Sequence, residues 1–325
     1  MAANNVSMSK KQYYTSDLPL EIVEIILSKL PIDSLLRFKA VSKSWNTMIS
    51  DLVFVQNPRN IFIPRCGNMG CRKQVVCSCD GVLLVADYFK RRYVLSNPST
   101  RAEIKLRFPY KFSNNSIFHG LCRDPTNGNF KVVILTPKYY AVYSCTNNSW
   151  TDKKEYPSNG RLLFNKREVI VNGSTYWIWR RDNNVEEILY IDPRDDMFKF
   201  IKTPKNVEHG KRIYVVSLKG FLCMYCYGRD ETEVRIWIKG KGLDNNSWNE
   251  LMTVENVRAS IDTFRPLCFL ENKIVIRVEV KEIAVYDPCE KTFEVLNECR
   301  YFHDFGLIPY TESLFFPRHV FLCRI

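Results

Sequence analysis

The chain has 325 residues, of which 46% are hydrophobic and 13% aromatic, and its formal net charge is +12. These proportions exclude a disordered chain and indicate one or two folded domains. No apolar run approaches the ~20 residues that a membrane-spanning helix requires, so we expect no membrane partner.

The N-terminal segment lacks the apolar stretch of a secretory signal, and residues 1–15 are predicted to form a flexible tail. A cytoplasmic or nuclear location, or both, follows from this expectation. Thiols stay reduced in those compartments, so the 12 cysteines are expected to be free.

Residues 16–56 are predicted to form three short helices. Asp17 is a suitable N-cap, Pro19 suits a first helical turn, and Pro31 ends the first helix. A second helix begins at Asp33 or Ser34, and a third is capped by Ser42. Apolar residues recur at helical spacing in the three segments: Ile22, Ile25, Ile26 and Leu30; Leu35, Leu36 and Phe38; Trp45, Met48 and Ile49. So short a module cannot bury all this surface alone, which indicates a groove or a partner helix.

This module resembles a plant F-box in its segments LP, SLLRF and VSKSW. The resemblance implies binding to a Skp-type adaptor and, through it, to cullin and RING subunits of a ubiquitin ligase. It places these residues in the docking surface or in its supporting core, without separating the two: Leu18, Pro19, Ile22, Leu30, Pro31, Leu35, Leu36, Val41 and Trp45. The alternative is a helical hairpin that only caps the following domain.

Residues 57–325 carry an internal repeat of about 47 residues. One series of residues opens apolar strands: Gly81, Gly128, Gly173, Gly220 and Asn272. A second series marks turns after the next strand: Ser96-Asn97-Pro98, Ser144-Cys145-Thr146, Ile191-Asp192-Pro193 and Tyr286-Asp287-Pro288. One member of the second series is missing near Lys239, where a longer turn is expected.

A repeat of this length with four short strands is typical of a propeller blade. In the second unit the strands are predicted at 117–122, 129–136, 140–145 and 150–156. We count five full blades and expect a sixth, assembled from strands at 312–316 and 320–323 and closed by residues 60–64. The predicted fold is therefore α+β and multidomain, with three helices followed by an all-β propeller-like domain of about six blades.

The repeat region also resembles the plant F-box-associated domain, found in S-locus F-box proteins and their relatives. The segments that carry the resemblance are CDGVLLV, LSNPSTR, GLCRDPTNGNFKVV, VYSCTNNSW, VNGSTYWI, ILYIDP and YTESL. The resemblance implies a substrate-recognition subunit of an SCF-type ligase, which captures a protein substrate on propeller loops. It does not identify the substrate.

Two cysteine groups have spacing that invites comparison with metal sites, namely Cys66, Cys71, Cys77 and Cys79, and the pair Cys223 and Cys226. Residues three apart on a strand point to opposite faces, so the pair cannot chelate one ion. We interpret these thiols as small core residues and expect no metal site and no cofactor.

Most of the positive charge falls in the repeat region, because residues 1–56 hold six basic and five acidic side chains. Blade topology places the basic connections 105–119, 153–168 and 199–212 on the same face as the second-to-third loops. Candidate substrate-binding residues on this face are Lys90, Arg91, Arg92, Tyr110, Lys111, Phe112, Arg180 and Arg181. Such a patch favours an acidic protein partner. The alternative is that these cations only keep the loops solvated.

Three other functions are alternatives to substrate capture. Catalysis by the chain itself is not expected, because none of the four histidines has a partner at a recognisable spacing and no catalytic motif is present. Nucleic-acid binding fits the net charge but lacks a base-reading motif. An interaction scaffold that presents nothing for ubiquitination stays open.

Overall fold

The computed structural model describes the greater part of the chain, namely residues 20–28, 30, 32–50, 60–64, 73–87, 92–107, 117–156, 159–163, 168–207, 210–228, 232–242, 247–258, 260, 263–279, 282–296 and 307–314. The chain divides into two units, Met1–Pro58 and Arg59–Ile325. The predicted fold class is confirmed, since three helices precede a domain of antiparallel sheets.

The first unit contains α1 (Leu20–Ser28), α2 (Ile32–Phe38) and α3 (Lys43–Ser50). The predicted cap of the third helix is confirmed, because Ser42 Oγ accepts a hydrogen bond from the Trp45 backbone N–H at 3.1 Å. The second helix begins at Ile32, slightly before the predicted Asp33 or Ser34. Asp17, Pro19 and Pro31 lie outside the described residues. No helix in the described part is long and apolar enough to cross a membrane.

Among the described residues of the second unit, five antiparallel sheets have four or five strands each, and we call them the first to fifth blades. The first blade holds β2 (Lys73–Cys79), β3 (Val82–Asp87), β4 (Arg92–Asn97) and β5 (Ala102–Arg107). The second holds β6 (Phe118–Arg123), β7 (Phe130–Leu135), β8 (Tyr139–Ser144), β9 (Ser149–Trp150) and β10 (Lys154–Glu155). The third holds β11 (Gly160–Leu162), β12 (Val169–Val171), β13 (Ser174–Arg181), β14 (Glu186–Asp192) and β15 (Met197–Ile201). The fourth holds β16 (Tyr214–Leu218), β17 (Phe221–Tyr227), β18 (Val234–Lys239) and β19 (Trp248–Val254). The fifth holds β20 (Arg265–Leu270), β21 (Lys273–Glu279), β22 (Glu282–Asp287) and β23 (Thr292–Val295).

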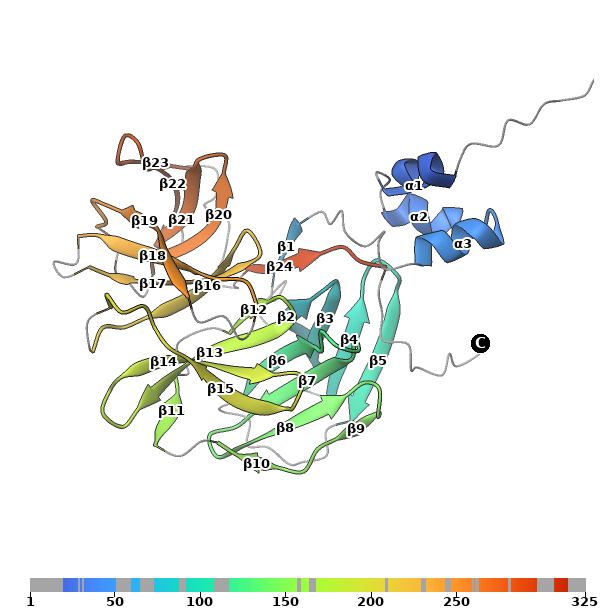
Figure 1. Ribbon diagram of the computed structural model, residues 1–325, viewed down its shortest axis with the longest axis horizontal. Helices are drawn as coiled ribbons and strands as arrows, with labels where there is room; N and C mark the ends of the chain where they lie inside the picture. Colours follow the sequence, from blue (N-terminus) through green and yellow to red (C-terminus); the bar gives the residue numbers. More distant parts are fainter. Residues whose placement is uncertain are drawn as a thin grey trace, which may run out of the picture. The chain divides into compact units, whose positions relative to one another are not determined.

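The blades follow one another in chain order around the domain, from the cyan strands of the first to the orange strands of the fifth (Figure 1). Successive blades contact one another through strands at the same edge of their sheets: β2 contacts β6, β6 contacts β12, β12 contacts β16, and β16 contacts β20. This arrangement is that of a propeller. In the second blade the predicted strands are confirmed to within about one residue, except that the fourth is split into β9 and β10.

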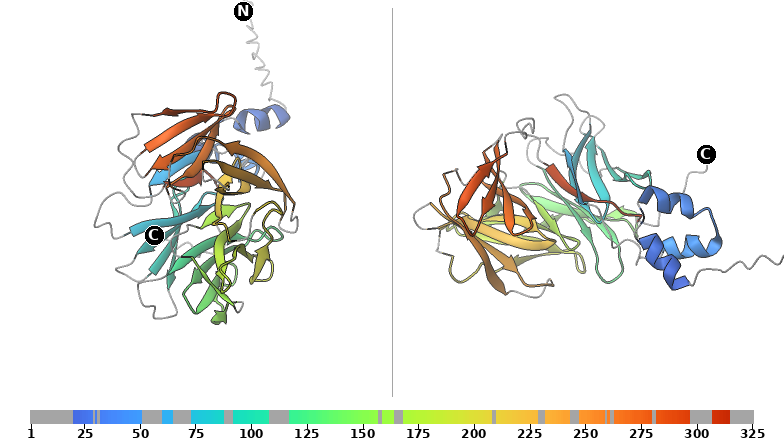
Figure 2. Two further views of the ribbon diagram at one scale, coloured as in Figure 1. Left: turned by 90° about the vertical axis from the view of Figure 1, so that its left-hand side faces the viewer. Right: turned by 90° about the horizontal axis from the view of Figure 1, so that it is seen from above.

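A further two-stranded sheet pairs β1 (Asn60–Pro64) with β24 (Leu307–Thr311). The two strands lie side by side in both views of Figure 2. The prediction that residues 60–64 join a C-terminal strand is confirmed, but the predicted partner was wrong. The partner begins at Leu307 rather than at residue 312, because the pairing register runs from Asn60 with Thr311 to Pro64 with Leu307. Residues 320–323 lie outside the described residues.

The described residues of the second unit form four hydrophobic clusters, each between two neighbouring blades. Strands in the middle of a blade are buried on both faces, so they read as unbroken apolar runs. Along β7, for example, Val132 and Ile134 pack toward the first blade, whereas Val133 and Leu135 pack toward the third. Trp177 and Trp179 fill the interface between the second and third blades. Tyr176, on the other face of the same strand, packs between the third and fourth blades.

Both series of turn residues perform a defined backbone task. Gly81, Gly128, Gly173 and Gly220 have positive φ angles of 72–78° at the first-to-second hairpins, a region that glycine adopts without steric cost. At the third-to-fourth turns, Asn97, Asp192 and Asp287 each accept a backbone N–H two residues ahead, at 2.9–3.0 Å. The repeat period therefore reflects two recurring turns, the glycine hairpin in four blades and the side-chain-capped turn in three.

Candidate functional site

The helical unit buries only part of its apolar surface. Among the residues whose side chains the structure describes, four form its core: Val23, Leu27, Leu35 and Ile49. Four others are exposed by 43–60%: Ile22, Ile25, Ile26 and Val41. The exposed isoleucines lie on α1 within about one helical turn of each other, so they form one apolar strip. We call Ile22, Ile25 and Ile26 the α1 strip.

The structure separates the predicted adaptor residues by burial. Leu35 belongs to the core at 3% exposure, whereas Ile22 and Val41 are exposed. Three more are half-buried: Leu30, Leu36 and Trp45. The Trp45 ring packs edge-on against Phe38, with centroids 5.5 Å apart. Leu18, Pro19 and Pro31 lie outside the described residues.

Ile25 and Ile26 were not among the predicted adaptor residues, although they belong to the exposed surface. The signal lay in the sequence of α1, LEIVEIILS, which carries two apolar stripes. One stripe, Val23 and Leu27, is spaced by four residues and faces the core. A helix with apolar residues on more than one side is covered by another partner in a stable assembly.

The described members of the predicted basic patch are held by carboxylates of their own blade. Arg180 lies 2.6 Å from Glu186, and Arg181 lies 2.6 Å from Glu187, across the β13–β14 hairpin. The Arg92 guanidinium lies 3.4 Å from the buried Asp87 carboxylate, across the β3–β4 hairpin. These pairs reduce the net positive potential at this end of the blades. The other predicted residues lie outside the described residues: Lys90, Arg91, Tyr110, Lys111 and Phe112.

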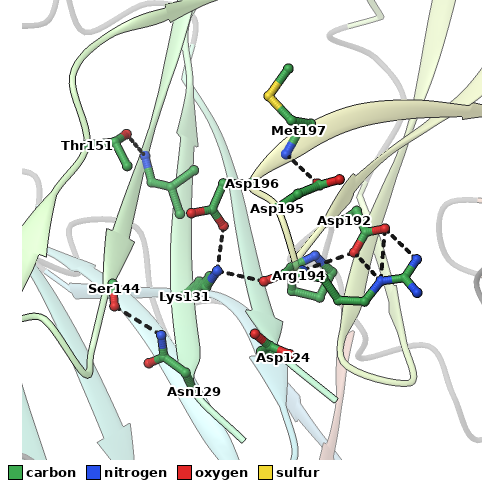
Figure 3. Close-up of polar contacts among 12 residues, drawn as sticks. Asp124, Asn129, Lys131, Ser144, Thr151, Asp192, Arg194, Asp195, Asp196 and Met197 are labelled. Carbon is green, nitrogen blue, oxygen red and sulfur yellow. Dashed lines mark hydrogen bonds and ion pairs between the residues drawn. The ribbon is translucent and has the colours of Figure 1, made fainter. Parts of the chain in front are cut away.

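A polar network joins the second and third blades at their turn ends (Figure 3). Lys131 on β7 donates to the Pro193 carbonyl at 2.6 Å and to Asp196 at 2.7 Å. The buried Asp192 carboxylate accepts from the Arg194 guanidinium and from Lys199, each at 2.6 Å. Burial raises the pKa of Asp192, but the bonds from Arg194 and Lys199 outweigh burial and hold this pKa well below its usual value. These bonds fix the third blade's turn against its neighbour.

The two cysteines on β17 are buried on opposite faces of their strand, as predicted. Cys223 packs toward the fifth blade and Cys226 toward the third, so they share no ligand position. Cys77 and Cys79 are buried together in the first cluster. In the part of the chain that the structure describes, no group of three or more His, Cys, Asp or Glu residues is placed to hold a metal ion.

Comparison with known proteins assigns both units. Residues 15–57 match the F-box domain, and residues 38–321 match the F-box associated beta propeller domain. An F-box/kelch-repeat protein of Arabidopsis thaliana is 23% identical, over 86% of this chain and 90% of its own length. An F-box/LRR-repeat/kelch-repeat protein of the same plant is 24% identical, over 90% and 95%. The Arabidopsis F-box protein CPR1 is 23% identical, over 81% and 79%. With the exposed helical surface and the blade repeat, these matches show that the chain belongs to the family of F-box proteins with an F-box associated β-propeller domain.

Proposed function

We propose that this chain is the substrate-recognition subunit of an SCF-type ubiquitin ligase. Its F-box docks a Skp-type adaptor, which connects it to cullin and RING subunits, and its propeller domain captures a protein substrate. The main support for the proposal is the α1 strip. In this chain the F-box exposes three isoleucines on one short helix, where a partner protein can cover them.

The α1 strip has the chemistry of a helix-docking surface. Burying one isoleucine fully contributes about 1.5–3 kcal/mol relative to leaving it in water, so three half-exposed isoleucines supply a substantial part of a stable interface. Val41, at 60% exposure, adds an apolar contact just after α2. The half-buried Trp45 is the kind of aromatic residue that is enriched among interface hot spots.

In this proposal the chain binds and does not catalyse. Transfer of ubiquitin belongs to the other subunits of the ligase, and the propeller holds the substrate within their reach. The substrate-binding loops are those between the second and third strands of each blade, together with the connections between blades. Lys90 and Arg91, next to the ion-paired Arg92, are proposed to attract an acidic surface of the substrate.

The docking step is tested by co-purification of the full chain with a Skp-type adaptor. We expect the wild-type chain to form a stable complex and the double variant Ile22→Asp/Ile26→Asp to lose it. The two positions are four residues apart on one helix face, and each already contacts water, so the exchange should not disturb the fold. Asn249→Asp is the matched control, because it adds a negative charge at an exposed position of β19. Undiminished binding by the double variant would refute docking through the α1 strip.

The substrate step is tested by quantitative proteomics in cells that lack the chain. A receptor predicts a small set of proteins whose abundance rises on deletion and falls again when the wild-type chain is restored. The Ile22→Asp/Ile26→Asp chain should not restore turnover, because it has lost the ligase. The triple variant Lys90→Glu/Arg91→Glu/Arg92→Glu should bind the adaptor but fail to restore turnover. If deletion changes the abundance of no protein that co-purifies with the chain, the domain is a scaffold instead.

A further inference from the structure

The strand β15 forms the outer edge of the third blade. Among the described residues it pairs with β14 alone, because it is the last strand in the order of its sheet. In an antiparallel pair, alternate residues direct their backbone N–H and C=O groups away from the partner strand. The outward groups of β15 are therefore available to a strand that is added at this edge.

The outer strands of the other blades carry features that discourage such an addition. β5 presents the exposed charges of Glu103 and Lys105. The outer strand of the second blade is broken into β9 and β10. β19 pairs with β18 through a shift of register and exposes Glu250, and β23 exposes Glu294. Charges, breaks and bulges of this kind protect a sheet edge against pairing with another chain.

β15 has none of these protective features. Its five residues, MFKFI, pair with β14 without a shift of register. Its one charged side chain is neutralised, because Lys199 Nζ lies 2.6 Å from the Asp192 carboxylate and 2.8 Å from that of Asp195. Met197, at the start of the strand, is 50% exposed. An apolar strand edge without a free charge therefore faces water.

One face of β15 forms an aromatic ridge with the second blade. Phe198 and Phe200 are half-buried against the cluster between the second and third blades. The ring centre of Tyr156, which follows β10, lies 5.7 Å from that of Phe198, and its hydroxyl donates to the Thr136 carbonyl at 2.6 Å. Side chains alternate between the two faces of a sheet, so every second side chain of an added strand would lie against this ridge.

Positive charge beyond the C-terminal end of β15 indicates the chemistry of the partner. Lys202 and Lys205 are exposed, and neither forms an ion pair with a residue that the structure describes. The Lys202 carbonyl accepts a hydrogen bond from the Trp248 indole N–H of the fourth blade at 2.8 Å, so the open edge ends at this residue. Antiparallel pairing places the N-terminal end of an added strand beside the two lysines, where acidic residues are attracted.

We propose that β15 binds an extended segment of a substrate protein as an additional antiparallel strand. The segment has acidic residues near Lys202 and Lys205, followed by apolar side chains at alternate positions that pack on Phe198 and Phe200. Backbone hydrogen bonds supply the affinity, and the alternate side chains supply the selectivity. The two lysines belong to a connection between blades, so this inference rests on the proposed function for the statement that the partner is a substrate.

Fluorescence polarisation of a labelled synthetic peptide with the full chain tests the pairing directly. The probe consists of two aspartates followed by three valine–threonine pairs, and we expect saturable binding. N-methylation of the valines removes the N–H donors along one edge of the peptide, and N-methylation of the threonines removes those along the other. Because only one edge faces β15, one methylated peptide should bind at least about tenfold more weakly than the other.

Changes in the protein locate the site. Met197→Asp places a charge on the open edge and should weaken the binding of the probe about fivefold or more, while the exposure of Met197 means that the fold should survive. Leu251→Asp is the matched control, because Leu251 is an exposed apolar residue on the outer strand of the fourth blade. The control should bind the probe as the wild type does.

The contribution of charge is tested in the same assay. Lys202→Glu/Lys205→Glu should weaken the binding of the probe about threefold or more at low salt, because both changes reverse an attraction. Lys219→Glu/Lys241→Glu is the control, since it reverses two exposed lysines in turns of the fourth blade and should leave the binding unchanged.

The outcome is separable from that of adaptor docking. Ile22→Asp/Ile26→Asp should bind the probe as the wild type does, so a failure of strand addition and a failure of docking are different results. No saturable binding up to about 1 mM, equal binding of the two methylated peptides, or equal losses in Met197→Asp and Leu251→Asp would each overturn the proposal. A dimer of the chain alone that Met197→Asp dissociates would overturn it as well, because the occupant of the edge would then be a second copy.

Discussion

Replacing Asp192 by asparagine isolates the contribution of one buried charge to the propeller. Asparagine occupies the equivalent position in the first blade, where Asn97 Oδ1 accepts the backbone N–H of Ser99 at 2.9 Å. Asp192→Asn should therefore keep the turn and its bond from the Arg194 backbone N–H at 3.0 Å. What it removes is the negative charge that the Arg194 guanidinium and Lys199 share.

The magnitude follows from the burial of the three groups. The Asp192 side chain has no exposed surface, whereas those of Arg194 and Lys199 are 35% and 39% exposed. A hydrogen bond to a charged group contributes about 1.5–3 kcal/mol, but exposed ion pairs contribute only about 0–1 kcal/mol. The two cations can turn back to water when the carboxylate is lost. Each contact is therefore expected to contribute a free energy between that of an exposed ion pair and that of a buried hydrogen bond to a charged group. We expect the free energy of unfolding to fall by about 2–3 kcal/mol.

Urea unfolding at pH 7, followed by tryptophan fluorescence, measures this loss, because five of the six tryptophans lie in the propeller domain. Asp287→Asn is the matched control. Asp287 ends the third strand of the fifth blade in the same way, but its partner Lys273 has a side chain that is 47% exposed. The control should be clearly less destabilised. Equal losses in the two variants would refute the view that burial of Asp192 gives its charge this effect.

The difference in unfolding free energy between the wild type and Asp192→Asn has a defined pH dependence. Burial raises the pKa of Asp192, but the bonds from Arg194 and Lys199 lower it further, so the folded-state pKa lies below the unfolded value of about 3.9. The stability from this charge is fully present above that unfolded pKa and is lost as the pH falls toward the folded one. The difference between wild type and Asp192→Asn should stay constant from about pH 7 to pH 5 and shrink below about pH 4.

Two further predictions test the closure of the domain and the state of its thiols. Gly81→Ala should destabilise the domain by about 1–3 kcal/mol more than Gly220→Ala, because a Cβ at Gly81 would lie 2.1 Å from Ser313 Cβ, whereas nothing lies within 4 Å at Gly220. Both glycines have nearly equal positive φ angles, so backbone strain cancels, and equal melting temperatures would contradict the contact with Ser313. At pH 8, iodoacetamide should modify the exposed Cys289 before the buried thiols, as peptide mapping can show. Burial raises the pKa of Cys122 to about 11 and those of Cys145 and Cys223 to about 12, so early labelling of these three would contradict their burial.

The blade repeat was predictable because its signal is local. Each hairpin needs a residue with positive φ or a side-chain oxygen at a fixed place, and these residues are spaced by one blade along the chain. The strand Leu307–Thr311 was not predicted, because its sequence LIPYT has no such turn beside it. Its partner strand, Asn60–Pro64, is also far away in the sequence, at the start of the domain. Pairing of this kind depends on closure of the domain and leaves no local pattern.

The candidate site was predictable only in part, for a related physical reason. Sequence shows that α1 is apolar on several sides, but only packing shows that Val23 and Leu27 face the core while Ile22 and Ile26 face water. The ion pairs of Arg180 and Arg181 follow from the register of one hairpin.

The pairing of β1 with β24 has a consequence for how the protein is made. The buried Asn97 side chain donates to the Ser313 carbonyl, 216 positions later in the chain. A ribosome adds about 5–20 residues per second, so the first blade waits on the order of ten to forty seconds for this neighbour. During that time β1 has no strand to pair with, and an unpaired strand edge favours association with other chains. A substitution that disrupts β24 is therefore expected to reduce the yield of folded protein as well as the stability of the finished domain.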